Sequence, residues 1–180
     1  MTDTTSSQFD RQIKQCREIF LKKTHDYGTS WRVLRPQSLT DQLFIKAQRI
    51  QTLQEKGTQM VEDSIELEFV ALVNYAIIGL IQMQLTGDKR IELKEGEAME
   101  LFDKNIAEIK ALMLAKNHDY GEAWRDMRVG SFVDLILMKL LRIKQIEDNK
   151  GKTLISEGID AGYRDIVNYS IFALIKLNEK

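Results

Sequence analysis

The chain has 180 residues, of which 43% are hydrophobic and 29% are charged, so it can bury the core of one compact domain or of two small ones. A formal net charge of −1 disfavours a nucleic-acid polymer as the partner, because no global basic field is present. With one Pro and 10 Gly, the composition favours helices over a turn-rich β architecture. A single cysteine, Cys16, excludes an intramolecular disulfide and a cysteine-based zinc site.

The first predicted helix covers residues 9–24, where apolar side chains recur at helical spacing. The residues before it have neither the basic nor the apolar region of a secretory signal, so we expect a cytoplasmic protein. The phrase HDYG at residues 25–28 ends this helix, with Gly28 as the stop. Trp31 and Arg32 follow within one further turn, so the phrase HDYGxxWR forms a compact polar and aromatic corner.

A second helix is predicted to begin at Ser38, because Ser is a favourable N-cap and the Asp three residues later resembles a capping box. This helix carries Lys46 and Arg49 on one face, since they are three residues apart. A third helix is predicted from about Glu62 to residue 85. Its long apolar run contains Asn74 and follows several acidic residues, so we expect a core helix and no membrane partner.

The second half of the chain repeats the first. His25 and His118 are 93 residues apart (118 minus 25), and this offset relates the first helix, the corner and the second helix to their counterparts. In the third helix the offset is 94, which pairs Asn74 with Asn168 (168 minus 74). Because the matches run through nearly the whole chain, we interpret it as a tandem duplication.

The predicted repeats are residues 1–90 and 91–180, and the helices of the second repeat are expected over residues 103–117, from Ser131, and over residues 156–177. We expect an all-α fold in which two three-helix units pack as a pseudo-twofold bundle. A duplication of this kind suggests an ancestor that worked as a homodimer. The chain itself would then be a monomeric pseudo-dimer or would form a homo-oligomer.

The corner is the first candidate site, and it has two interpretations. Its Tyr and Trp can stack on a base while its Arg holds a phosphate through two hydrogen bonds. Alternatively, the aromatic rings close the end of the bundle, Asp caps a helix and Arg pairs with a carboxylate. The candidate ligand-binding residues are His25, Asp26, Tyr27, Trp31 and Arg32 in the first copy and Asp119, Tyr120, Trp124 and Arg125 in the second, with His118 as a general acid or base.

The second helix supplies cations that interrupt an apolar stretch. They are Lys46 and Arg49, repeated as Lys139 and Arg142. A helix this apolar is largely buried, and buried cations need partners. We interpret these four residues either as phosphate-binding groups of the ligand site or as side chains that reach solvent or a neighbouring carboxylate.

The third helix of the second copy carries an acidic face with Glu157, Asp160, Asp165 and Asn168. Carboxylate oxygens that converge in this way suit Mg²⁺ or Mn²⁺, with the three acids as metal ligands, Asn168 at the bound molecule and Asp165 also in a catalytic role. The alternative is a salt-bridge network with nearby Lys and Arg side chains. In the first copy Ala71 replaces Asp165, so the second copy is the better candidate for an active site, unless both copies complete one composite site.

Together these motifs resemble the DUF1599 family, also called nucleotide modification associated domain 1. The likeness rests on HDYG at residues 25–28 and 118–121, and on DIVNYSIFAL and ALVNYAIIGL at residues 165–174 and 71–80. This resemblance implies a tandem, helical member associated with nucleotide metabolism or modification. A more distant likeness is to the all-α nucleoside triphosphate pyrophosphohydrolases of the MazG and dimeric dUTPase type, which use helical carboxylates and Mg²⁺. Their E-E-x-x-E motif has no counterpart here.

Three functions are compatible with these residues. The first is binding of a nucleotide, with Mg²⁺-dependent hydrolysis of its phosphates. The second is a non-catalytic nucleotide sensor, which the less acidic first copy favours. The third is a structural or partner-binding bundle in which the corner is only a packing motif.

Overall fold

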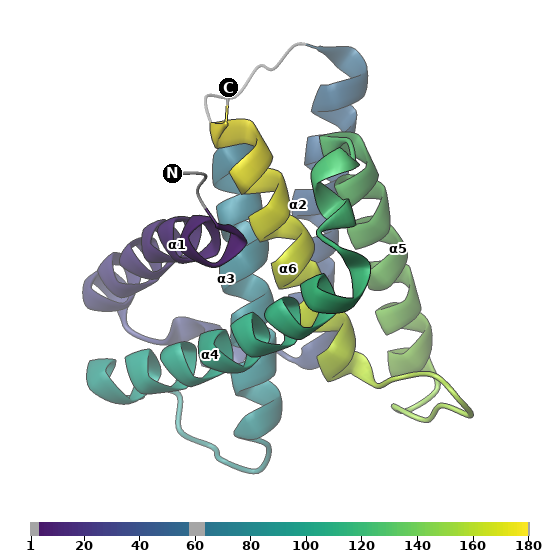
Figure 1. The fold of residues 1–180 in the computed structure, drawn as a ribbon. Helices are drawn as coiled ribbons and strands as arrows, with labels where there is room; N and C mark the ends of the chain where they lie inside the picture. Colours follow the sequence, from purple (N-terminus) through teal and green to yellow (C-terminus); the bar gives the residue numbers. More distant parts are fainter. Residues whose placement is uncertain (1–3, 58–63, 180) are drawn as a thin grey trace.

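The computed structural model of the chain describes residues 4–57 and 64–179 (Figure 1). These residues form six α-helices, two short 3₁₀ helices and no strand, which confirms the all-α prediction. Each repeat contributes three α-helices, and a 3₁₀ helix forms the corner between the first two. The bounds are Thr5–Tyr27 for α1, Pro36–Lys56 for α2, Ile65–Gln84 for α3, Glu95–Tyr120 for α4, Val129–Asp148 for α5 and Ile159–Asn178 for α6, with the 3₁₀ helices at Ser30–Val33 and Ala123–Asp126.

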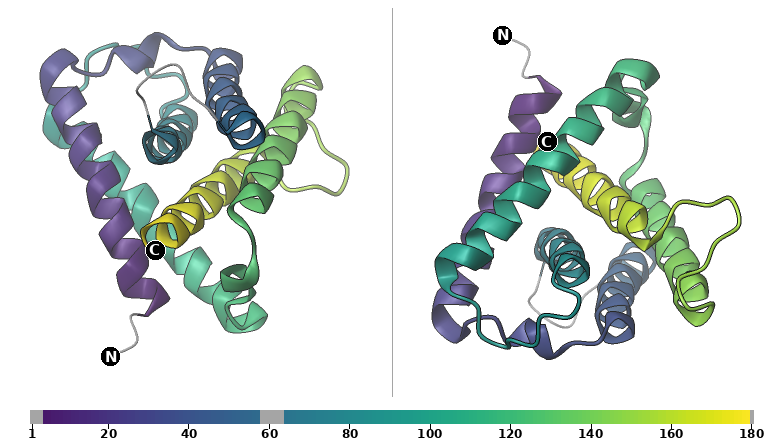
Figure 2. Two further views of the ribbon diagram at one scale, coloured as in Figure 1. Left: turned by 90° about the horizontal axis from the view of Figure 1, so that it is seen from above. Right: turned by 90° about the horizontal axis from the view of Figure 1, so that it is seen from below.

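Each α-helix packs against its own counterpart from the other repeat. Seen along the bundle, the pairs lie in three layers: α1 with α4 on one side, α3 with α6 in the middle, and α2 with α5 on the other side (Figure 2). Contacts between an element and its own duplicate are what a twofold arrangement produces. The predicted tandem duplication and pseudo-twofold bundle are therefore confirmed.

Individual side-chain pairs repeat across this symmetry. Arg17 of α1 binds Asp103 of α4 with 2.7 Å between Nε and Oδ1, and Lys110 of α4 binds Asp10 of α1 with 2.8 Å between Nζ and Oδ1. The offset of 93 residues carries Arg17 onto Lys110 and Asp10 onto Asp103 (110 minus 17, 103 minus 10). Exposed ion pairs contribute only ~0.2–1 kcal/mol each, so they follow the symmetry rather than cause it. Two further reciprocal sets are Lys144–Asp41 with Gln51–Asp134, and Gln84–Asn105 with Asn178–Gln12.

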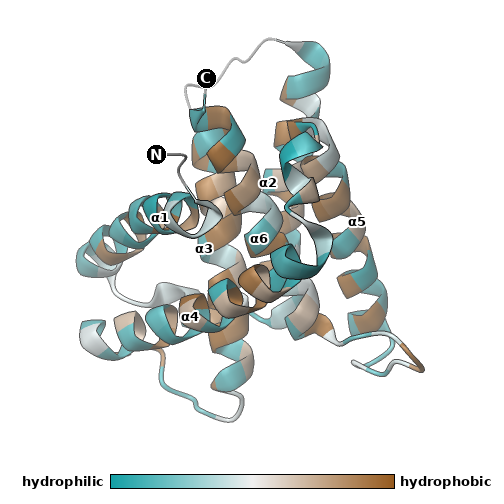
Figure 3. Cartoon of the chain, in the orientation of Figure 1, coloured by the Kyte–Doolittle hydropathy of each residue, from teal (hydrophilic) through white to brown (hydrophobic). Residues whose placement is uncertain are grey.

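The middle layer supplies a large part of the core. The buried residues of α3 and α6 include Phe69, Leu72, Ile77, Ile166 and Ile171, and both helices are largely hydrophobic (Figure 3). Burial of one large aliphatic or aromatic side chain contributes ~1.5–3 kcal/mol, which is more than an exposed ion pair provides. Among the described helices, α3 is the one long and apolar enough to cross a membrane. Of its apolar 18-residue stretch, 67% is buried inside the bundle.

The starts of the second helices differ from the prediction. Ser38 and Ser131 are not N-caps, because α2 begins two residues earlier at Pro36 and α5 begins two residues earlier at Val129. Proline is favourable at the first position of a helix, where its missing N–H would have no helical partner and its φ angle already suits the helix. Both Ser residues therefore lie inside the first turn.

The third helices begin later than predicted where the structure describes them. In the first repeat, Ser64 is the N-cap of α3, and its Oγ accepts a hydrogen bond from the Leu67 N–H at 3.1 Å. The predicted start at Glu62 lies outside the described residues. In the second repeat α6 begins at Ile159 and not at Ser156, because the Ser156 carbonyl accepts a hydrogen bond from the Thr153 hydroxyl at 2.8 Å in a turn of the preceding loop.

Tyr163 joins the two repeats through the core. It lies on α6, and its hydroxyl shares a hydrogen bond of 2.9 Å with the Thr40 hydroxyl of α2. Its ring rests on Gly79 of α3, where a Cβ atom would lie 3.0 Å from the ring. Burial raises the pKa of Tyr163 to about 12, although the hydrogen bond with Thr40 lowers it.

We expect the free energy of unfolding to fall as the pH rises from about 10 to about 12. An unfolded Tyr loses its proton near pH 10.0, whereas folded Tyr163 keeps its proton up to about pH 12, so ionisation in this window favours the unfolded chain. Urea unfolding at a series of pH values measures the decline. Tyr163→Phe should make the decline shallower and Tyr120→Phe, at an exposed position, should not; equal declines in the two variants would contradict this assignment.

Candidate functional site

The repeated corner is a helix stop followed by a 3₁₀ helix. Gly28 and Gly121 end α1 and α4 with φ angles of 70° and 59°, in the range that favours glycine over other residues. The Gly28 N–H donates to the Thr24 carbonyl at 2.8 Å and closes the last turn of α1. The predicted role of this glycine as the helix stop is confirmed.

Trp31 and Trp124 close the bundle at the two corners. They are 8% and 5% exposed. Trp124 stacks on Phe172 of α6, with 4.4 Å between the ring centroids and 7° between the ring planes. The Arg125 guanidinium lies over the same ring, 4.5 Å from its centroid. Trp124 is therefore packed as a core residue, which favours the structural interpretation of the tryptophans over base stacking.

The two corner arginines tie the corners to neighbouring segments. The Arg32 side chain is 5% exposed and donates to two carbonyl oxygens of residues 88–90, at 2.6 and 2.9 Å, in the linker after α3. Arg125 donates to Thr5 Oγ1 at 2.8 Å and to Gln8 Oε1 at 2.7 Å, both on α1. Because the protein itself engages these donors, the structural interpretation of the arginines also has more support than phosphate binding.

Gln82 and Lys176 hold the corners from the third helices and were not among the predicted site residues. Gln82 Nε2 donates to the Trp31 and Leu34 carbonyls, each at 3.2 Å, and Lys176 Nζ donates to the Arg125 carbonyl at 2.6 Å. Both positions match at the offset of 94 (176 minus 82). A comparison of identical residues does not find them, because Gln and Lys differ while the carbonyl-binding role is shared.

The remaining corner side chains face solvent. The His118 side chain is 89% exposed, and Tyr120 is 74% exposed. His118 Nδ1 lies 3.1 Å from Asp119 Oδ1, and His25 Nδ1 lies 3.5 Å from Glu95 Oε2. Packing therefore explains the Gly, Trp and Arg of the repeated phrase, but it does not explain the His, Asp and Tyr. The first-copy counterparts Asp26 and Tyr27 are exposed as well.

A cavity of about 710 Å³ lies beside the corner of the first copy. It is bounded by α1, the corner, α2 and α3, and we call it the corner cavity. Binding sites for small molecules commonly have volumes of about 300–1,000 Å³. Much of its wall is apolar, and the side chains with polar or aromatic groups include Lys23, Tyr27, Trp31, Lys46, Glu68, Asn74 and Tyr75.

Glu68 places a buried carboxylate in the wall of the corner cavity, and it was not among the predicted site residues. Its side chain is 4% exposed and lies 3.0 Å from Arg49 Nη1 and 3.6 Å from Lys46 Nζ. Asn74 donates to the Cys16 carbonyl at 3.0 Å. Within the described ranges, Glu68 Oε2 and Asn74 Oδ1 accept no hydrogen bond. An unsatisfied buried acceptor such as Asn74 Oδ1 costs ~1–3 kcal/mol, so a ligand that brings a hydrogen-bond donor can stabilise this wall.

In the second copy the lysines equivalent to Lys23 and Lys46 both form ion pairs with Asp165. Lys116 Nζ lies 2.9 Å from Asp165 Oδ1, and Lys139 Nζ lies 2.9 Å from Asp165 Oδ2. Burial lowers the pKa of Lys116, but the hydrogen bond and the charge of Asp165 outweigh this effect and the pKa is raised. Asn168, one turn along α6, is buried, and its Oδ1 accepts no hydrogen bond from the part of the chain described. Lys116 and its match Lys23 were not among the predicted site residues.

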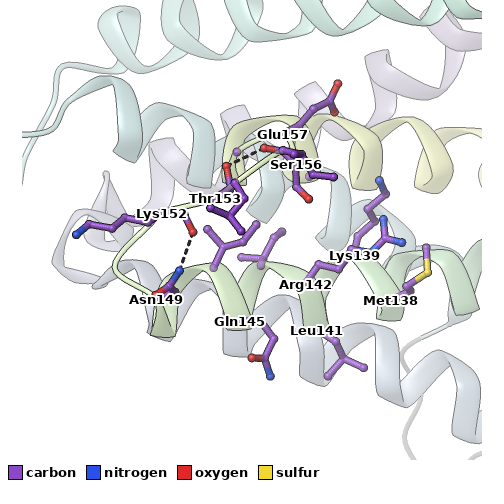
Figure 4. Close-up of a pocket in the computed structure, with 16 residues that line it drawn as sticks. Met138, Lys139, Leu141, Arg142, Gln145, Asn149, Lys152, Thr153, Ser156 and Glu157 are labelled. Carbon is purple, nitrogen blue, oxygen red and sulfur yellow. Dashed lines mark hydrogen bonds between the residues drawn. The ribbon is translucent and has the colours of Figure 1, made fainter.

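A second cavity, of about 1140 Å³, lies between α5 and the loop before α6, and we call it the loop cavity. Lys139 and Arg142 line it and point from α5 toward the side where Glu157 and α6 lie (Figure 4). Gly162 of α6 also lines it, at the position that Glu68 occupies in the first copy (162 minus 68 is 94). The structure therefore brings Lys139, Arg142 and Glu157 to one cavity, but this cavity lies away from the corner of the second copy.

The predicted acidic face does not converge on one point. Glu157 precedes α6, Asp160 pairs with Arg164 at 3.0 Å, and Asp165 pairs with two lysines. No group of three or more His, Cys, Asp and Glu side chains among the described residues is arranged to hold a metal ion. Because Mg²⁺ and Mn²⁺ prefer several oxygen ligands around one point, these three carboxylates do not fit such an ion as they are arranged here, and the metal assignment stays a prediction.

Comparison with known families agrees with the repeat and with the corners. The family described as nucleotide modification associated domain 1, DUF1599, matches residues 23–83 and 116–177, which together make up more than half of the chain. The chain belongs to the DUF1599 family. Each DUF1599 segment includes one complete corner and the lysine just before it, Lys23 or Lys116. No curated protein and no solved structure matches the chain, and the likeness to MazG-type pyrophosphohydrolases stays a prediction.

We expect the two parts of the repeated phrase to respond differently to truncation. Trp124→Ala should lower the free energy of unfolding by ~3–5 kcal/mol, because it removes a large ring from the core. Tyr120→Ala and His118→Ala should each change it by less than ~0.5 kcal/mol, because these side chains are exposed. Urea unfolding of the three variants measures the difference. A large destabilisation by either exposed substitution would mean that the whole phrase is a packing motif.

Proposed function

We propose that the protein binds a nucleotide in the corner cavity of its first copy. The observation that carries this proposal is that Lys23, Lys46, Tyr27 and Tyr75 line one space of about 710 Å³. A nucleotide combines an anionic phosphate with a flat base, and cationic and aromatic side chains bind these two groups. Membership of a family described as nucleotide modification associated supports the same class of ligand.

Lys23 and Lys46 are suited to the phosphate. In the ranges 4–57 and 64–179 no ion pair or hydrogen bond engages the side-chain ammonium group of Lys23, so its positive charge is available to a ligand. Lys46 lies 3.6 Å from Glu68, which also binds Arg49. Because a Lys ammonium has three N–H donors, Lys46 can keep this carboxylate and still donate to a phosphate oxygen.

Tyr27 and Tyr75 are suited to the base and the sugar. Burial raises the pKa of Tyr27, and the neighbouring Tyr75 and Asp26 raise it further. Like any tyrosine hydroxyl it is protonated and able to donate at neutral pH, while its ring offers a stacking face. Asn74 contributes an amide to the same cavity, where it can accept from an amino group or a hydroxyl of the bound molecule.

A non-catalytic nucleotide sensor is the second candidate, and the surroundings of Asp165 and His118 favour it over Mg²⁺-dependent hydrolysis. Two lysines neutralise Asp165 at 2.9 Å each, and His118 is exposed on the second copy, outside the corner cavity. Hydrolysis would predict that Asp165→Asn loses Mg²⁺-dependent turnover while keeping its fold. Product analysis of that variant and of the parent protein separates the two functions.

We expect one or more nucleotides to raise the midpoint of thermal unfolding. A ligand that binds only the folded chain adds ~2.7 kcal/mol of stability when it is present at about one hundred times its dissociation constant. The measurement is thermal unfolding with ribo- and deoxynucleoside mono-, di- and triphosphates, with and without Mg²⁺. Absence of stabilisation by all of them would contradict the proposal and favour a bundle that binds a protein partner.

Lys23→Met and Lys22→Met form a matched pair for this experiment. Lys23 lines the corner cavity, so its loss removes a charge-assisted hydrogen bond and should weaken nucleotide binding by about tenfold or more. Lys22 is exposed and pairs with Glu18 at 2.9 Å, so its loss should leave binding nearly unchanged. Equal effects of the two substitutions would place the nucleotide elsewhere.

A further inference from the structure

The two copies place the carboxylate of the third helix at different positions relative to the equivalent lysines of their second helices. In the first copy Glu68 faces Lys46, and Ala71 follows one turn later. In the second copy Gly162 stands at the position of Glu68, and Asp165 stands at the position of Ala71 (both offsets are 94). The carboxylate that a partly buried lysine needs has thus moved by one helical turn between the repeats.

The two cavities meet the third helices at different positions of this pattern. Glu68 and Ala71 both line the corner cavity, so the first copy is open toward its corner. Gly162 lines the loop cavity, so the second copy is open toward its loop, and Asp165 lies between Lys139 and Lys116 instead. A Cβ atom at Gly162 would lie 3.0 Å from the Ile143 side chain, so a longer side chain does not fit there unless Ile143 moves.

We infer that the Asp165 carboxylate takes, in the second copy, the place that an anionic group of the nucleotide takes in the first. Its two oxygens lie 2.9 Å from Lys116 Nζ and 2.9 Å from Lys139 Nζ, which is the distance at which a phosphate oxygen would accept from the same ammonium groups. The matching lysines of the first copy, Lys23 and Lys46, line a cavity that also reaches Ala71. The inference rests on the proposed function of the corner cavity.

The consequence is one nucleotide site for each chain, in the first copy. A phosphate that approaches Lys116 and Lys139 must displace a carboxylate held by two charge-assisted hydrogen bonds, whereas the first copy has only the methyl group of Ala71 at that position. Asp165 therefore acts as an internal competitor for the ligand, and the second copy acts as the scaffold of the pair. This assigns Asp165 a different role from that of a metal ligand.

The test is the number of molecules bound and their affinity, from native mass spectrometry and isothermal titration calorimetry. The probes are ATP, the four common deoxynucleoside triphosphates and inorganic pyrophosphate. We expect the parent chain to bind one molecule of the probe that binds best, and Asp165→Ala to bind two. Asp103→Asn removes an exposed carboxylate from the pair with Arg17 and should still bind one.

The first copy provides the reciprocal experiment. Ala71→Asp should introduce the internal competitor and weaken binding by at least about tenfold relative to Ala71→Asn. These two variants differ by a charge at almost equal volume, so the comparison separates neutralisation of the lysines from loss of space. Their affinities decide the question even if Asp165→Ala does not fold, and equal affinities would overturn the inference.

The remaining outcomes separate this inference from the proposed function. Two molecules bound to the parent chain, or one bound to folded Asp165→Ala, would overturn the inference and leave nucleotide binding intact. Loss of Mg²⁺-dependent binding in Asp165→Ala would also overturn it, because Asp165 would then be a metal ligand. No binding of any probe to the parent chain would overturn the inference, and the proposed function would fall with it only when the full panel of nucleoside mono-, di- and triphosphates also gives no thermal stabilisation.

Discussion

The packing of α3 against α6 is the constraint on which the other features of this bundle depend. These helices are the most extensively buried, and each packs against its own duplicate and against the helices on either side. A helix buried in this way cannot rotate or shift by one residue without moving apolar side chains into solvent. The positions that face the second helices, Glu68 and Ala71 or Gly162 and Asp165, are therefore held in register with the lysines opposite them.

That register gives a change of one helical turn a large local effect. A carboxylate that moves from the position of Glu68 to the position of Asp165 shifts by about 5 Å along the helix axis. A carboxylate at either position neutralises the equivalent lysine of its own repeat, so the fold accepts either position. The space beside the lysine differs as well, because Glu68 and Ala71 both line the corner cavity of the first copy, whereas Gly162 lines the loop cavity of the second.

The repeated corner has a second, separable origin. Trp31 and Trp124 complete the core, and the two arginines tie each corner to a segment outside its own helix. A buried Trp contributes several kcal/mol, whereas an exposed His or Tyr contributes almost nothing to stability. The presence of HDY in both copies is therefore not explained by packing, and the exposed Tyr27 meets a cavity in the first copy.

Periodicity and spacing along the chain are enough to predict the helical class, the duplication, the glycine stops and the buried character of α3. The capping pattern at Ser38 predicts a start that is too late for the second helix, since Pro36 already begins it. Which charges meet depends on how the separate helices pack against one another. The spacing of the acids predicts that they share one face of the third helix. The lysines that bind Asp165, however, come from α4 and α5, and residue spacing within one helix does not specify distances between separate helices.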